Sequence, residues 1–147
     1  MVSIRHFTEN DADSLCTHQF PDLTHEDVLN LIRDWNSLSY RGKYFEMFAV
    51  LSDETIIGSV SLFQHSQTVA SVGVEIYESF RHMGFAYEAI LLLLDHAKLL
   101  GYGIIQDQVR TDNAASIRLH EKLLFETDRY IYRNEKNIPC YLFLKAL

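Results

Sequence analysis

The chain of 147 residues is long enough to bury one hydrophobic core and short enough to form a single domain over residues 1–147. Its formal net charge of -7 argues against nucleic-acid binding, which needs clustered Lys and Arg, and no apolar run is long enough to cross a membrane. Met1 is not followed by the apolar segment of a signal peptide, and the two cysteines, Cys16 and Cys140, lie far apart. We therefore expect a cytoplasmic protein with free thiols.

The first half of the chain predicts one strand, two helices and a pair of strands. Apolar and polar residues alternate from Val2 to Phe7, which is the period of a strand. Thr8 and Thr24 each precede acidic residues, as the N-cap residues of helices do. We expect a strand at 2–7, helices at 9–19 and 24–35, and strands at 44–51 and 55–63 around a tight turn at 52–54.

The second half predicts strands that alternate with helices. Val72, Val74 and Ile76 alternate with other residues, and apolar residues then recur at helical spacing until Gly101, a typical residue at a helix C-terminus. Gly73 fits a β-bulge. The aromatic side chains of the last two strands suit either the core or a homodimer interface. We expect a strand around 72–76, a helix from about 86 to before 101, a strand at 104–109, a helix at 113–124, and strands at 129–132 and 141–144.

The strand at 72–76 passes into the next helix through the turn Arg81-His82-Met83-Gly84-Phe85-Ala86. The first N–H groups of a helix have no internal partner, and the helix dipole favours negative charge there. A glycine also lets the backbone approach an anion closely. The spacing is neither a Walker loop nor G-x-G-x-x-G. The turn therefore predicts an anion site of another kind.

Two motifs resemble those of the GNAT superfamily of N-acetyltransferases. Arg81, Gly84 and Ala86 match its R-x-x-G-x-G/A signature. The helix at 113–124 is similar to its N-x-x-S/A-x-x-L-Y-E-K-x-G-F pattern, with His120 and Leu124 in place of Tyr and Gly. The predicted order β-α-α-β-β-β-α-β-α-β-β also matches the GNAT fold, an α/β (α+β) fold with a mixed central sheet of about seven strands and about four helices.

The resemblance implies that the protein binds acetyl-CoA as a co-substrate. In this family the turn grips the pyrophosphate, and the backbone of the preceding strand bonds the pantetheine arm. On the helix at 113–124, Asn113 and Ser116 also fit helix capping, and Lys122 also fits a solvated surface. The cofactor-binding residues implied by the resemblance are Val74, Ile76, Arg81, His82, Met83, Gly84, Phe85, Ala86, Asn113, Ser116 and Lys122.

Acetyl transfer to a primary amine needs the neutral amine, and deprotonating an alkylammonium at pH 7 costs about 4.6 kcal/mol. A general base lowers this barrier. Glu75 is the first candidate because it lies on the strand that holds the cofactor; Glu46 and His65 are weaker candidates, and Gln108 cannot act as a base. His120 holds the register of a tyrosine that protonates the CoA thiolate in relatives, so it is either a general acid or a helix-surface residue.

The resemblance thus implies an N-acetyltransferase that works by direct attack of the amine through a tetrahedral intermediate. The departures at His120 and Leu124 leave a second interpretation, a non-catalytic CoA-binding sensor or scaffold of the same fold. The seven histidines show no metal-ligand spacing, so we expect no metal.

The acceptor amine is the part of the function that the sequence leaves open. In this family it enters near the first two helices and the central strands. A protein N-terminus, a lysine side chain, a polyamine and other small amines are all compatible, as is an acyl group longer than acetyl. The residues expected near the amine are Trp35, Tyr40, Phe45 and Tyr130.

Overall fold

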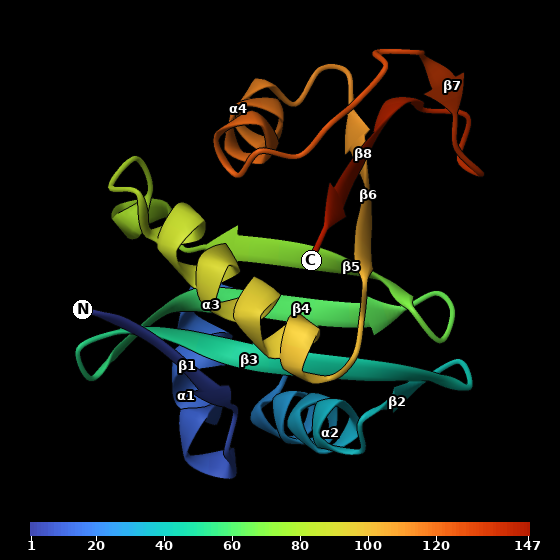
Figure 1. Ribbon diagram of the computed structural model, residues 1–147. Helices are drawn as coiled ribbons and strands as arrows, with labels where there is room; N and C mark the ends of the chain where they lie inside the picture. Colours follow the sequence, from blue (N-terminus) through green and yellow to red (C-terminus); the bar gives the residue numbers. More distant parts are fainter.

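A mixed sheet of eight strands forms the centre of the protein in the computed structural model, which describes residues 1–147 (Figure 1). The strands follow the order β1-β3-β4-β5-β6-β8-β7, and the short strand β2 pairs only with β3. Neighbours are antiparallel except β5 and β6, which are parallel. The strands are β1 (Val2–His6), β2 (Ser39–Tyr40), β3 (Lys43–Ser52), β4 (Thr55–Gln64), β5 (Val69–Ile76), β6 (Ile104–Arg110), β7 (Tyr132–Arg133) and β8 (Pro139–Ala146).

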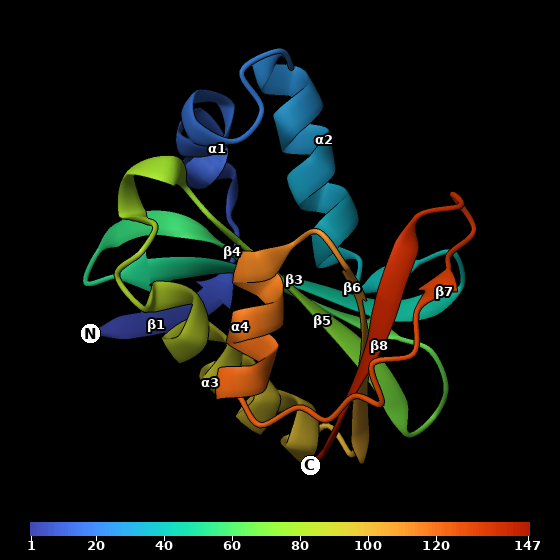
Figure 2. The same cartoon turned by 90° about the horizontal axis from the view of Figure 1, so that it is seen from above.

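Helices cover both faces of this sheet (Figures 1 and 2). They are α1 (Ala12–His18), α2 (His25–Asn36), α3 (Phe85–Leu99) and α4 (Ala114–Lys122). Helices α1 and α2 lie on one face, and α3 lies on the other (Figure 2). The order of the main elements confirms the predicted order. No helix is both long and apolar enough to cross a membrane.

Each face of the sheet buries its own core because side chains along a strand alternate in direction. On β3, Phe48 and Val50 join the larger core under α3. Ala49 and Leu51, the residues between and after them, join the smaller core under α1 and α2. The two cores pack against the sheet from both sides, so the strands that carry a site are held in place.

Thr24 begins α2 as predicted, whereas Thr8 precedes a 3-10 turn and not α1 itself. Thr24 caps α2 through a capping box: its Oγ1 accepts the Asp27 N–H at 3.1 Å, and Asp27 Oδ2 accepts the Thr24 N–H at 3.2 Å. The helix expected at 9–19 is instead a 3-10 turn over Glu9–Asp11 followed by α1. The Asp11 carboxylate accepts the Thr8 N–H in a capping box at the start of that turn and also pairs with Arg5 of β1.

The chain passes from β5 through α3 to the parallel strand β6, and the candidate site lies between these two strands. The β4–β5 register runs without a shift through the pair Ser61–Gly73, so the bulge suggested at Gly73 is wrong. A Cβ at Gly73 would lie 2.9 Å from Ser61 Oγ, so the serine side chain would have to move to admit one. On the other edge of β5, only Val69 and Ala70 pair with β6.

The C-terminal strands differ from their predicted bounds. The strand expected at 129–132 is β7, which covers only Tyr132–Arg133. Arg129 has a positive φ of 59°, and the Tyr130 N–H donates to Asp128 Oδ1 at 2.9 Å, so this segment forms a turn. The two-residue strand β2 is too short to give a periodic pattern in the sequence.

Candidate active site

A fork opens between the parallel strands β5 and β6. Their ladder stops after the pairs Val69–Ile104 and Ala70–Ile105. The next β5 N–H on this edge, that of Val72, donates to Asp107 Oδ1 at 2.9 Å instead of to a backbone carbonyl. Since backbone groups two residues apart on a strand point the same way, the N–H and C=O of Val74 also face the fork.

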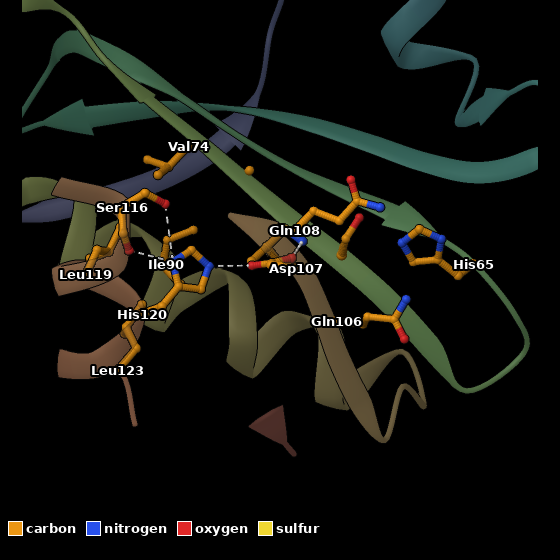
Figure 3. Close-up of a pocket in the computed structure, with 13 residues that line it drawn as sticks. His65, Val74, Ile90, Gln106, Asp107, Gln108, Ser116, Leu119, His120 and Leu123 are labelled. Carbon is orange, nitrogen blue, oxygen red and sulfur yellow. Dashed lines mark hydrogen bonds and ion pairs between the residues drawn. The ribbon is translucent and has the colours of Figure 1, made fainter. Parts of the chain in front are cut away.

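A cavity of about 400 Å³ occupies this fork (Figure 3). One wall is apolar, and the other is polar and carries one titratable group, His65. The apolar wall carries Val72, Val74, Ile90, Leu119 and Leu123; the polar wall carries His65, Ser71, Gln106 and Gln108. Gly73, Asp107, Ser116 and His120 complete the lining.

His120 and Asp107 form a buried pair in the fork (Figure 3). Only 8% of His120 and 4% of Asp107 is exposed. The ring Nε2 lies 2.7 Å from Asp107 Oδ2, and Nδ1 lies 2.7 Å from the Ser116 carbonyl oxygen. Burial lowers the pKa of His120, but the hydrogen bonds to Asp107 and Ser116, together with the charge of Asp107, raise it by more than burial lowers it, so the net shift is upward. His120 is therefore not a helix-surface residue.

The C-terminus of α4 fixes the histidine ring. The Phe125 N–H donates to the His120 carbonyl at 2.9 Å, and the Leu124 N–H donates to the Glu121 carbonyl at 3.0 Å. These two bonds make a Schellman motif. The motif also brings the ring of Phe125 to 4.8 Å from the ring of His120, edge to face.

A second cavity, of about 720 Å³, lies at the N-terminus of α3. Gly84 is the N-cap residue of α3 and has a φ of 82°, a conformation that favours glycine. Most of the turn and the facing side of α4 line this cavity. Ten of the eleven predicted cofactor-binding residues are part of the lining: Val74, Ile76, Arg81, His82, Gly84, Phe85, Ala86, Asn113, Ser116 and Lys122.

Met83 is the predicted residue that does not line the cavity; 62% of it is exposed. Arg118 and Tyr87 line the cavity although neither was among the predicted residues. Arg118 lies four residues before Lys122 on α4, and this helical spacing is the signal that indicates it. Lys122 Nζ lies 4.3 Å from the centre of the Tyr87 ring, a cation–π contact.

Asn113 caps α4, because its Oδ1 accepts the Ser116 N–H at 3.1 Å. Both the capping and the cavity position expected for Asn113 are therefore present. Ser116 lies at the boundary between the two cavities and lines both of them.

Glu75 lies beside the turn and not in the fork cavity. Arg81 Nη2 donates to Glu75 Oε1 at 3.0 Å, and Arg81 Nε donates to the Ile76 carbonyl at 2.8 Å. About half of each charged side chain is exposed, so the pair is weak and easily exchanged. Glu75 points to the face of β5 opposite Val74 and Ile76.

The weaker base candidates lie in different places. His65 is on the polar wall of the fork cavity. Glu46 is buried away from the fork, where Tyr44 Oη donates to it at 2.7 Å and His6 and His96 contact it. Burial raises the pKa of Glu46, but the hydrogen bonds from Tyr44, His96 and His6 together lower it by more than burial raises it, so the net shift is downward.

The residues expected near the amine do not form one group. Trp35 packs in the core under α1 and α2, against Phe7. Tyr40 and Phe45 contact each other at the end of β3, and Tyr130 is 71% exposed near β7. None of the four lines the fork cavity.

Fold and site together place a helix N-terminus with free N–H groups next to a strand whose backbone faces an open fork. The chain matches the Acetyltransferase (GNAT) domain family over residues 2–126. The protein therefore belongs to the GNAT acetyltransferase family.

Known proteins with similar sequence or fold agree with this assignment. The SPbeta prophage-derived uncharacterized N-acetyltransferase YokL of Bacillus subtilis is 35% identical over 99 residues, which are 65% of this chain and 56% of that protein. RimL, a ribosomal protein alpha-N-acetyltransferase solved in complex with coenzyme A, superposes with a TM-score of 0.84 at 15% identity, covering 99% of this chain and 94% of RimL. The structure of yncA from Salmonella typhimurium with its cofactor acetyl-CoA gives 0.74 at 14% identity, covering 100% and 94%. These structures show the fold that the sequence predicts.

Proposed function

We propose that the protein is an acetyl-CoA-dependent N-acetyltransferase that moves the acetyl group to a primary amine by direct attack. The observation that carries this proposal is the shared wall of the two cavities, which Val74, Ser116 and Leu119 line together. A long molecule with an anionic part can lie with its phosphates at the turn and its far end in the fork. Acetyl-CoA has this form, with a pyrophosphate in the middle and a thioester at the end.

The turn and α4 supply the groups for the phosphates. The first N–H groups of α3 have no partner within the helix, and Arg81, Arg118 and Lys122 bring positive charge to the same cavity. The pantetheine arm would follow β5, where the N–H and C=O of Val74 face the fork. Ile76 would offer its N–H, since its carbonyl already accepts from Arg81.

The fork then supplies groups for the reaction. We assign the Val74 N–H to the thioester carbonyl, where it would stabilise the oxyanion of the tetrahedral intermediate. The amine nitrogen attacks the carbonyl carbon and forms the C–N bond. When the intermediate collapses, the C–S bond breaks and the thiolate leaves. His120 is the proposed donor of a proton to that thiolate.

Glu75 is the proposed general base for the amine. It lies on the same face of β5 as Ser71, and Ser71 is on the polar wall of the fork. Its carboxylate pairs with Arg81. A pyrophosphate at the turn would compete for Arg81, and Glu75 would then be free to accept a proton.

A matched pair of variants tests this assignment. E75Q and H65Q each replace a titratable side chain by a neutral one, and His65 is the titratable group on the polar wall of the fork cavity. We expect E75Q to lower kcat about 100-fold, the usual contribution of a general base, and H65Q to lower it less than threefold. The reverse pattern would assign the base to His65 and contradict the proposal for Glu75.

The function itself is tested by thiol release from acetyl-CoA with a panel of peptide N-termini, lysine peptides, polyamines and small amines, beside acetyl-CoA binding by calorimetry. We expect saturable binding and release with one class of amine. Binding without release on any amine would favour the sensor or scaffold interpretation. Absence of binding would contradict the assignment of the turn as a pyrophosphate site.

A further inference from the structure

Asp107 uses both of its carboxylate oxygens inside the fork. Oδ1 accepts the Val72 N–H at 2.9 Å, in the place where the β5–β6 ladder has stopped. Oδ2 lies 2.7 Å from His120 Nε2. The side chain is held by β5 from one side and by α4 from the other, and 4% of the residue is exposed. A carboxylate fixed in this way sets the environment of the histidine ring.

The geometry of His120 requires a proton on each ring nitrogen. Nδ1 lies 2.7 Å from the Ser116 carbonyl, which can only accept, so Nδ1 carries a hydrogen. A lone pair on Nε2 at 2.7 Å from a carboxylate oxygen would be repelled, so a second proton lies between Nε2 and Asp107 Oδ2. A neutral imidazole beside an ionised Asp107 cannot satisfy both contacts.

Asp107 is the charged group that acts on this ring. The other rings against it are those of Phe125 and Phe143, which do not titrate, and the apolar wall of the fork adds Leu119 and Leu123. The upward shift of the His120 pKa agrees with this arrangement, since burial alone would act in the opposite direction. The proton on Nε2 therefore depends on one neighbour.

We propose that Asp107 is a positioning residue that keeps His120 protonated on Nε2, so that a proton for the CoA thiolate is present at the alkaline pH at which the acceptor amine becomes neutral. This inference rests on the proposed function. The two demands otherwise conflict: an imidazole with its ordinary pKa of about 6.5 is only about 3% protonated at pH 8, whereas an alkylamine with a pKa of about 10.4 becomes mostly neutral only above that pH.

The proposed step balances. As the C–S bond breaks, its electron pair goes to sulfur, and the thiolate takes the proton that lies between His120 Nε2 and Asp107 Oδ2, so the hydrogen bond to Asp107 is broken in this step. The ring is left neutral with its hydrogen on Nδ1, still bonded to the Ser116 carbonyl. The proton lost by the new amide nitrogen goes to the general base. His120 then recovers a proton from solvent, because the neutral ring faces the carboxylate of Asp107 with a lone pair.

The variant D107N tests the inference with little change of shape. Asn Oδ1 can still accept the Val72 N–H, and its amide group can donate to Nε2 of a neutral ring, so the substitution favours the neutral imidazole. We expect NMR titration of ¹³Cε1-labelled histidine to show the His120 pKa falling by about one unit or more. We expect kcat at pH 8.5 to fall at least tenfold and the alkaline limb of its pH profile to move to lower pH, with a smaller loss in acid.

Two further variants separate this role from a structural one. D95N changes an exposed carboxylate on α3 and should leave the His120 titration and the pH profile unchanged. H120Y supplies a phenol, which stays protonated to about pH 10 without a carboxylate, so adding D107N to H120Y should cost less than threefold.

The inference is overturned if D107N leaves the His120 titration where it is, or if it lowers kcat equally at all pH values. The titration does not need turnover. If no amine supports turnover by the unmodified protein, the proposed function fails, and the titration alone still decides whether Asp107 holds the proton on His120.

Discussion

Leu124 occupies a position that favours glycine, so the variant L124G should stabilise the protein. Its φ is 65°, in the left-handed region, and it is the residue after the C-cap of α4. Helix α3 ends with the same two hydrogen bonds: the Tyr102 N–H donates to the Ala97 carbonyl and the Gly101 N–H to the Lys98 carbonyl. There the equivalent residue is Gly101, with a φ of 99°.

The expected magnitude follows from three opposing contributions. A left-handed L-residue costs roughly 1–2 kcal/mol, which L124G removes. Glycine costs about 0.5–1 kcal/mol through the added freedom of the unfolded chain. Leu124 is 76% exposed, so losing its side chain forfeits about 0.5 kcal/mol of burial at most. The sum is a gain of about 0.5 kcal/mol in the free energy of unfolding, or about 1–2 °C in Tm.

Thermal unfolding followed by circular dichroism measures this change. The matched control is L99G, in the last turn of α3, where the leucine is 87% exposed and helical. L99G has no strain to relieve, so it should lower the free energy of unfolding by about 0.5–1 kcal/mol. If both variants shift Tm downward by the same amount, backbone strain at Leu124 is not what distinguishes them and the reasoning is refuted.

Three further predictions concern Arg81 in the turn before α3, the buried carboxylate of Glu46, and Gly58 on β4, which pairs with β5. R81Q should raise the Kd for acetyl-CoA about tenfold in calorimetry, the loss of one charge-assisted hydrogen bond, while R133Q on β7 should leave it unchanged; equal effects would exclude a specific role for Arg81. Because the folded-state pKa of Glu46 is lowered, its stabilisation is present above the ordinary carboxyl pKa and is lost as pH falls through the folded value. E46Q should therefore lower Tm at pH 7 and flatten its decline between about pH 5 and pH 3; an unchanged acid slope would contradict this. G58A should destabilise by about 3 kcal/mol in urea unfolding, because its Cβ would lie 2.1 Å from a β5 carbonyl oxygen, whereas G103A, whose nearest atom is 4.0 Å away, should change little.

The helices and strands whose apolar residues recur at a regular spacing were predictable from the sequence. The apolar spacing on α3 marks the five residues that the structure buries, and Thr24 marks the start of α2. The contact of Arg5 on β1 with Asp11, at the junction of the 3-10 turn and α1, was not predictable from the sequence. A contact between separate elements leaves no trace in local periodicity.

The turn before α3 and its place beside a cavity were predictable because a turn and a helix N-terminus are local features. Met83 does not line the cavity, because only the three-dimensional path of the turn decides which residues face it. Asp107 was missed because the sequence analysis considered its neighbour Gln108, which lies one residue later and on the other face of β6. The register of a strand inside a fork is set by its neighbours and not by its own sequence.

The proposed function requires acetyl-CoA to lie along β5 with its phosphates at the turn before α3. Titration of ¹⁵N-labelled protein with acetyl-CoA, followed by the backbone amide signals, tests this placement directly. We expect saturable shifts of the Val74 amide and of the amides at 82–86, with little change in the signals of α1 and α2. Saturable shifts confined to other parts of the sheet, or no shifts at millimolar acetyl-CoA, would contradict it.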